Sequence, residues 1–449
     1  MKIDINDKFR EECGIVGILS KKKFNLSSMM FYSLNSLQHR GQESCGITYS
    51  DGEKLVCQKD MGLVSEVFSK NNLKEAIGFS AIGHVRYSTY GESTITNAQP
   101  ILDDYTYGQI ALAHNGNLTN AAIIKKHLTE SGFKFNTGTD SEVILKLIQK
   151  KYDSSIEKTL KLVANQITGG YAVVILTKDS LYAMRDTNGI RPLCIGKFND
   201  GYIVCSESCA LDIVGGEFIR DVYPGEIIKI SKDGIETINS IKNPSCHTCA
   251  FEYIYFARQD SVIDGISVYK SRLKAGELLY KECPADGDIV VGIPDSGIAA
   301  ALGYSKASSI PYETGFVRNN FIGRTFISPL QNKREEALTA KLNVIKGNVQ
   351  GKRVIVVDDS IVRGTTCKKI ISLLKEAGAK EIHFRLASPI IKSPCYLGIN
   401  TKCKKELIGS SMSVEEINDY IGANSLGYIS IEGLLTCLRK ETACLKCFK

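Results

Sequence analysis

The chain has 449 residues, of which 43% are hydrophobic and 23% are charged, and its net charge at pH 7 is +7. This length and balance predict about two or three globular domains, each with its own core. The charge is modest and no long lysine and arginine run occurs, so a small phosphate-bearing substrate explains it as well as nucleic acid would. No apolar run is long enough to span a membrane, which argues against a membrane protein.

The first twelve residues are rich in charge and lack the apolar core of a signal peptide, so a cytoplasmic location is expected. In that compartment the 15 cysteines are better explained as thiols, metal ligands or a nucleophile than as disulfides.

The first cysteine, Cys13, directly precedes residues 14–19, an apolar run that predicts a buried strand. A lone cysteine there is most simply a small buried hydrophobic side chain. If residues 1–12 are a leader that is removed, Cys13 becomes the N-terminus, and its α-amine, with a pKa of about 8, can act as a base. One residue would then supply both the nucleophile and the base.

Four polar segments follow in the first half of the chain, at residues 38–44, 83–89, 113–117 and 137–142. Each segment alone predicts only a turn or a helix cap. In the last segment Asp140 or Ser141 is expected to cap a helix that continues through the apolar positions after it.

In this order behind Cys13, the segments resemble the class II glutamine amidotransferases, which use an N-terminal nucleophile. The resemblance covers residues 13–245 and implies an α+β domain with four layers, αββα. It also implies a role for each of the polar residues. Cys13 attacks the glutamine amide, Asn115 and Gly116 stabilise the oxyanion, Arg86 holds the α-carboxylate, and Asp140 holds the α-ammonium group.

Periodicity stops around residues 243–249, which predicts a linker and a second domain over residues 246–449. Residues 353–357 form a short β-branched run that predicts a buried strand, and a helical pattern follows at residues 368–377. The turn between them carries two acids suited to sugar hydroxyls or Mg²⁺, and then glycine and two threonines suited to a phosphate at a helix N-terminus.

This turn resembles the phosphoribosyl pyrophosphate (PRPP) motif of the type I phosphoribosyltransferases, which have an α/β fold. The resemblance implies PRPP contacts from Asp358, Asp359, Ser360, Arg363, Gly364, Thr365 and Thr366. It also implies one Mg²⁺ per subunit at Ser296, Asp358 and Asp359. The segment from residue 321 to residue 341 suits a lid, and Arg324 and Lys341 are its candidate pyrophosphate contacts.

Both motifs in this order, together with residues 251–261, resemble the amidophosphoribosyltransferases. That family hydrolyses glutamine and transfers the ammonia to C1 of PRPP, giving 5-phosphoribosylamine, glutamate and pyrophosphate at the start of purine synthesis. The resemblance further implies feedback inhibition by purine nucleotides and a homotetramer. Because ammonia must reach PRPP without becoming ammonium in bulk water, a closed path between the two sites is expected.

A Cys-x-x-Cys pair, Cys444 and Cys447, lies near the end of the chain. The resemblance to the iron–sulfur subgroup of the family implies that these residues, with Cys249 and Cys395, hold one [4Fe–4S] cluster per subunit. A Cys₄ zinc site, a redox pair and unrelated thiols are the alternatives.

Two other functions are alternatives to that of the amidophosphoribosyltransferases. A nucleobase-salvage phosphoribosyltransferase with an unrelated N-terminal domain would be indifferent to Cys13. A PRPP-sensing regulator that binds nucleic acid would need a recognition helix or a basic patch, and the sequence shows neither.

Overall fold

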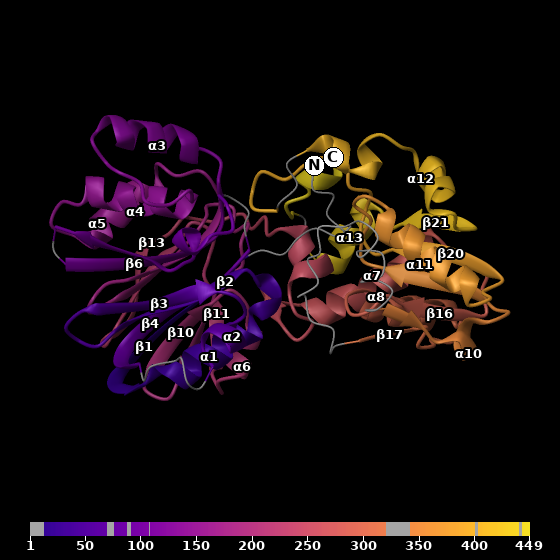
Figure 1. Ribbon diagram of the computed structural model, residues 1–449, viewed down its shortest axis with the longest axis horizontal. Coiled ribbons are helices and arrows are strands. Elements are labelled where there is room, and N and C mark those ends of the chain that lie inside the picture. Colours follow the sequence, from indigo (N-terminus) through magenta and orange to yellow (C-terminus); the bar gives the residue numbers. More distant parts are fainter. Residues whose placement is uncertain are drawn as a thin grey trace.

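The computed structural model describes residues 13–69, 76–87, 91–106, 108–319, 342–399, 403–439 and 442–449, which form two lobes side by side (Figure 1). The expected leader, residues 1–12, and the lid candidates Arg324 and Lys341 lie outside the described residues. Among the helices that the structure describes, none combines the length and the apolar character needed to cross a bilayer.

The first lobe contains two antiparallel sheets. One has seven strands in the order β11-β9-β10-β1-β4-β2-β3, and the other has six in the order β13-β12-β8-β7-β6-β5. The strands of the first are β1 (Gly14–Asn25), β2 (Ser44–Ser50), β3 (Leu55–Met61), β4 (Ile77–Arg86), β9 (Cys194–Phe198), β10 (Gly201–Cys205) and β11 (Glu217–Asp221). Those of the second are β5 (Ile101–Tyr105), β6 (Gly108–Leu118), β7 (Gly169–Leu176), β8 (Leu181–Arg185), β12 (Ile227–Ser231) and β13 (Gly234–Asn239).

The two sheets pack face to face, and β1 shows how. Ile15 and Leu19 belong to the core between the sheets, whereas Val16 and Ile18 face the helices outside. Because side chains alternate along a strand, a strand buried on both faces is apolar throughout.

Helices cover the outer face of each sheet. They are α1 (Leu26–Ser36), α2 (Val64–Val67) and α6 (Cys209–Asp212) on the seven-stranded sheet, and α3 (Ala121–Glu130), α4 (Asp140–Lys151) and α5 (Ile156–Ala164) on the six-stranded sheet. The predicted αββα arrangement is therefore confirmed.

The second lobe is built on a parallel sheet in the order β16-β19-β20-β21, with strands β16 (Ile289–Gly292), β19 (Arg353–Asp358), β20 (Glu381–Leu386) and β21 (Ser425–Tyr428). Helices α7 (Val268–Glu282) and α8 (Gly297–Ser308) pack on one face, and α11 (Thr365–Glu376) and α12 (Val414–Ile421) pack on the other. Helices on both faces of a parallel sheet define the predicted α/β domain.

This lobe has shorter elements as well, among them the 3-10 helices η4 (Lys404–Glu406), η5 (Ile408–Ser410) and η6 (Lys446–Phe448). The others that the structure describes are the π-helix η3 (Glu252–Phe256), the strand pairs β14 (Val262–Ile263) with β15 (Ile266–Ser267) and β17 (Phe316–Arg318) with β18 (Leu342–Val344), and helices α10 (Lys346–Val349) and α13 (Ile431–Leu438). The exact boundary between the domains, placed by the sequence at residues 245 and 246, stays a prediction.

The predicted cap of α4 is wrong. Thr139 is the N-cap, and its side chain accepts a hydrogen bond from the Glu142 amide at 3.4 Å. Asp140 instead begins the helix, because its carboxylate accepts a hydrogen bond from the Leu118 amide of β6 at 2.9 Å. The Asp140 carboxylate therefore binds the neighbouring sheet and does not cap the N-terminus of α4.

Candidate functional site

Cys13 lies immediately before β1 and is 5% exposed. Its thiol donates to the Tyr87 carbonyl at 3.4 Å. It opens onto a pocket, here called the Cys13 pocket, lined by Cys13, Arg86, Tyr87, Gln99, His114, Gly116, Thr139, Asp140 and Ser141. Four of the five residues predicted for glutamine chemistry therefore line one pocket.

The fifth, Asn115, lies on β6 beside Gly116 and is fully buried. Neither its side-chain oxygen nor its nitrogen has a hydrogen-bond partner in the described part of the chain. A buried amide without partners is unfavourable unless a ligand completes it.

Gly116 has φ +134°, and a Cβ there would lie 2.0 Å from the Gly170 carbonyl oxygen of β7. Only glycine fits this close approach of the two strands. The backbone around Asn115 is therefore held in place by the sheet.

Opposite charges face the Cys13 pocket from two different elements. Arg86 ends β4, and its guanidinium lies 3.9 Å from the Glu43 carboxylate and donates to the Glu92 carbonyl at 3.2 Å. Asp140 begins α4 and lies 3.7 Å from Nδ1 of His114. A buried cation and a buried anion in one pocket suit a zwitterionic amino acid.

Burial raises the pKa of the Cys13 thiol to about 11, although the charge of Arg86 opposes the rise. Burial also lowers the pKa of two neighbouring histidines, His84 to about 3 and His114 below its usual value. Both imidazoles are therefore neutral near pH 7, and neither can stabilise a Cys13 thiolate by its charge.

At the second site, the side chains of Asp358, Asp359 and Ser360 are buried at the end of β19. Asp359 accepts hydrogen bonds from the hydroxyls of Ser296 at 2.5 Å and Ser360 at 2.7 Å. Oxygen atoms from the ends of β16 and β19 thus gather at one place, as the sequence predicted. Such ligands suit a hydrated Mg²⁺, which takes few ligands from protein.

The turn after β19 ends at Gly364, the N-cap of α11, with φ +81°. Thr365 and Thr366 form the first turn of this helix, and the backbone N–H groups of a first turn point along the axis out of the helix end. These groups and the positive helix end suit a phosphate. Arg363 donates instead to the Glu406 carboxylate at 2.7 Å.

The four cysteines of the expected cluster come together from three segments. Cys249 and Cys444 form a parallel β-bridge, and all four side chains belong to, or pack against, one apolar cluster with Phe251 and Phe448. Burial raises the pKa of the Cys447 thiol, and the charges of Cys395 and Cys444 raise it further. Thiols are the donor type that an iron–sulfur cluster requires. Within the described ranges, however, no three His, Cys, Asp or Glu side chains stand in position to hold a metal ion.

Three other cysteines that lie near the proposed ligands in the sequence have different surroundings. The Cys246 thiol contacts Thr248 and Asp264, Cys403 is exposed, and the Cys437 thiol donates to the Gly433 carbonyl inside α13.

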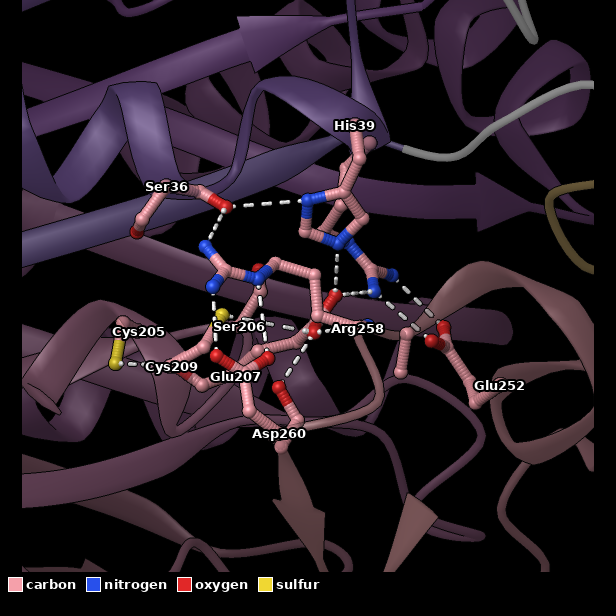
Figure 2. A network of polar contacts seen from close by, with 12 residues as sticks. Ser36, His39, Cys205, Ser206, Glu207, Cys209, Glu252, Arg258 and Asp260 are labelled. Atoms are coloured by element: carbon pink, nitrogen blue, oxygen red, sulfur yellow. Dashed lines mark hydrogen bonds and ion pairs between the residues drawn. The ribbon is translucent and has the colours of Figure 1, made fainter. Parts of the chain in front are cut away.

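No prediction from the sequence concerns a buried ionic cluster where the lobes meet, here called the domain junction, which consists of Arg40, Glu207 and Glu252. Figure 2 labels its two glutamates. Arg40 donates to Glu207 at 2.6 Å and to both carboxylate oxygens of Glu252 at 2.8 and 2.9 Å. All three side chains have zero exposure. Arg40 and Glu252 lie in segments used for the resemblance, but residues 212 positions apart give no local sign of a contact.

Known proteins match both lobes. The glutamine amidotransferase domain family matches residues 84–212, and the phosphoribosyl transferase domain family matches residues 274–402. The chain is 47% identical to an amidophosphoribosyltransferase of Methanothermobacter thermautotrophicus, over 98% of this chain and 94% of that protein. The Bacillus subtilis amidophosphoribosyltransferase is 45% identical, over 98% of this chain and 93% of that protein.

A solved structure is similar across both lobes as well. It is described as glutamine phosphoribosylpyrophosphate (PRPP) amidotransferase from B. subtilis complexed with ADP and GMP. It aligns with a TM-score of 0.92 and 44% identity, covering 97% of this chain and 96% of that one.

The fold and the matches define an enzyme in which a glutamine amidotransferase domain precedes a phosphoribosyltransferase domain. The chain belongs to the amidophosphoribosyltransferase family, the glycosyltransferases that catalyse the first step of purine biosynthesis. Because relatives align over both lobes, a salvage enzyme with an unrelated first domain and a regulator without activity are both excluded.

The raised pKa of Cys13 predicts how its thiol reacts. In protein that retains residues 1–12, alkylation of Cys13 by iodoacetamide should be slow at pH 7 and rise about tenfold per pH unit, because the thiolate is the reacting form. Arg86→Gln should move this profile to higher pH, since Arg86 lowers the pKa. Mass spectrometry of the peptide containing Cys13 measures the rate. A midpoint near neutral pH would contradict this description of the pocket.

Proposed function

We propose that the Cys13 pocket hydrolyses glutamine with the residues that the sequence singled out. Cys13 attacks the amide carbon, and the Asn115 side chain and the Gly116 N–H donate to the oxyanion. Arg86 binds the α-carboxylate of glutamine and Asp140 binds its α-ammonium group. The observation that carries this proposal is the buried Asn115 amide, which lacks a partner among the described residues beside the pocket that holds the other four.

Removal of residues 1–12 would free the α-amine of Cys13 as the base. Two observations support this step: burial raises the pKa of the thiol to about 11, and the neighbouring histidines have lowered pKa values. An amine with a pKa of about 8 on the same residue is a suitable proton acceptor near neutral pH.

Asn115→Ala should separate catalysis from stability. We expect kcat for glutamine hydrolysis to fall about 100- to 1000-fold, as for loss of one oxyanion donor. The melting temperature should fall less than in Asn97→Ala. Asn97 is also buried, but its amide forms two hydrogen bonds, to the Glu92 carbonyl and from the Gly138 amide, that its removal breaks. Steady-state kinetics and calorimetry measure both effects, and unchanged kcat in Asn115→Ala would refute the oxyanion role.

We propose further that the turn from Asp358 to Thr366 binds PRPP. Asp358 and Asp359 bind the ribose hydroxyls, and Ser360, Arg363 and the backbone of Gly364, Thr365 and Thr366 bind the 5′-phosphate. One Mg²⁺ per subunit, held near Ser296, Asp358 and Asp359, would neutralise the departing pyrophosphate when bound. Arg324 and Lys341 remain candidate pyrophosphate contacts on sequence grounds.

Asp359→Asn should raise KM for PRPP about tenfold or more, since hydrogen bonds to a charged group are lost. Asp288→Asn is the matched control. Asp288 is also acidic, but it precedes β16 at the opposite end of the same sheet and pairs with Arg353. Pyrophosphate release with ammonia as the nitrogen source isolates this site from the Cys13 pocket. Equal KM values in the two variants would contradict the assignment.

We propose that Cys249, Cys395, Cys444 and Cys447 hold one [4Fe–4S] cluster per subunit, with a structural role, since the transfer reaction has no redox step. Their convergence in one apolar cluster supports this, and a zinc site is the competing possibility.

Cys447→Ser should lose iron and sulfide and melt at a lower temperature than the wild type. Cys437→Ser is the control, because Cys437 is a buried thiol of the same terminal segment outside the proposed ligand set. Metal analysis and visible absorption of protein purified without oxygen give the result. Zinc in place of iron, or iron retained in Cys447→Ser, would reject the cluster assignment.

The remaining expectations also stay proposals: inhibition by purine nucleotides, a homotetramer and a cytoplasmic location. For inhibition the support is that the solved B. subtilis relative is complexed with ADP and GMP.

A further inference from the structure

The domain junction contacts the backbone of the residue that carries the proposed nucleophile. Besides its two carboxylate partners, Arg40 donates from Nε to the backbone carbonyl of Cys13 at 3.0 Å. One guanidinium therefore holds the residue that carries the thiol and, through its other nitrogens, Glu207 in the first domain and Glu252 in the second. The planar fork of arginine fixes these three directions relative to one another.

Glu207 is held firmly without help from Glu252. Its carboxylate also accepts from His39 at 2.8 Å, from the Ser261 hydroxyl at 2.7 Å and from the Arg258 amide at 2.9 Å (Figure 2). Although burial opposes its ionisation, His39 and Arg40 hold the pKa of Glu207 well below its usual range. Loss of Glu252 would therefore leave Arg40 charged and paired on one side only.

On the second-domain side, Glu252 begins the π-helix η3, and the buried Arg272 holds this helix from α7. Arg272 of α7 donates to the carbonyls of Tyr253 at 2.7 Å and Ala257 at 2.8 Å. Burial lowers the pKa of Arg272 to about 10, and the charge of Asp359 opposes this effect. Single π-helical turns are frequent at functional sites.

We propose that Glu252 is a positioning residue that the second domain contributes to the glutamine site, acting on Cys13 through Arg40. This inference rests on the proposed role of Cys13. If residues 1–12 are removed, no peptide bond holds Cys13 on its N-terminal side. The hydrogen bond from Arg40 to the Cys13 carbonyl then fixes the position of the residue that carries the reacting thiol and amine. A displacement of about 1 Å at such a residue lowers rates about 100-fold.

Glu252→Gln tests the proposal. The glutamine amide keeps the size of the side chain but turns one acceptor oxygen into a donor that faces the donors of Arg40. We expect kcat for glutamine hydrolysis, measured with PRPP and Mg²⁺ present, to fall about 10- to 100-fold. KM for glutamine should change little because Arg86 and Asp140 are untouched. Pyrophosphate release with ammonia should be retained.

Asp264→Asn is the matched control for a merely structural contact. Asp264 of the second domain pairs with the buried Arg185 of the first at 2.8 Å, but this pair does not touch Cys13. Asp264 also has φ +47°, a conformation that asparagine tolerates. This variant should keep kcat for glutamine hydrolysis, whatever its melting temperature.

Arg40→Lys tests independently whether Glu252 acts on Cys13 through Arg40. Lysine keeps the positive charge but cannot bond the Cys13 carbonyl and both carboxylates in one plane. It should lower kcat to a similar extent, and the double variant Arg40→Lys with Glu252→Gln should be no slower than the slower single variant, because both changes act through one contact.

These experiments distinguish failure of the positioning role of Glu252 from failure of the proposed nucleophile. Equal loss of kcat in Glu252→Gln and Asp264→Asn, or unchanged kcat in Glu252→Gln, would overturn the positioning role. So would additive losses in the double variant. If Glu252→Gln does not fold, Arg40→Lys against Asp264→Asn decides the question. If Cys13→Ala still hydrolyses glutamine, the proposed nucleophile itself is wrong, which is a different failure.

Discussion

The two domains meet at a charge that cannot be left without partners. Arg40 is completely buried, and removing a guanidinium from water is unfavourable unless carboxylates replace the hydration that it loses. Glu207 lies in the stretch that matches the glutamine amidotransferase family, and Glu252 lies beyond it on η3, which precedes α7 of the second lobe, so separating the lobes here would break the cluster. The relative position of the lobes is thus tied to a hydrogen bond on the residue that carries the proposed nucleophile.

The two sites obtain their reactivity from different kinds of backbone. In the first lobe, antiparallel strands from facing sheets carry Arg86 and Asn115, and tight pairing of β6 with β7 leaves room only for glycine at position 116. In the second, a parallel sheet brings the carboxyl ends of its strands together, where acids and a helix N-terminus meet. One arrangement encloses an amino acid, and the other suits a phosphorylated sugar with its metal ion.

Much of this arrangement could be predicted from the sequence. The β-branched run at residues 353–357 was expected as a strand, and β19 extends it by one residue to Asp358. Apolar residues that recur every two residues in a strand, or every 3.6 in a helix, can be recognised within a short stretch of sequence. Acidic residues that follow a strand can be recognised in the same way. The four-layer arrangement came from family resemblance, because periodicity alone does not say which sheets stack.

The features that could not be predicted from the sequence depend on contacts between residues far apart in the chain. The helix cap at Thr139 was missed because Asp140, a better cap by type, is bound to the Leu118 amide of another element. The ionic cluster at the junction was missed for the same reason, since Arg40 and Glu252 come together only when both domains have folded.

In this enzyme, nitrogen released from glutamine in one domain is used in the other. The most direct test is the stoichiometry of glutamate and pyrophosphate when glutamine is the sole nitrogen source. We expect one glutamate for each pyrophosphate in the wild-type enzyme, and neither product in Cys13→Ala. Pyrophosphate formed from glutamine by Cys13→Ala, or pyrophosphate without matching glutamate, would contradict this expectation.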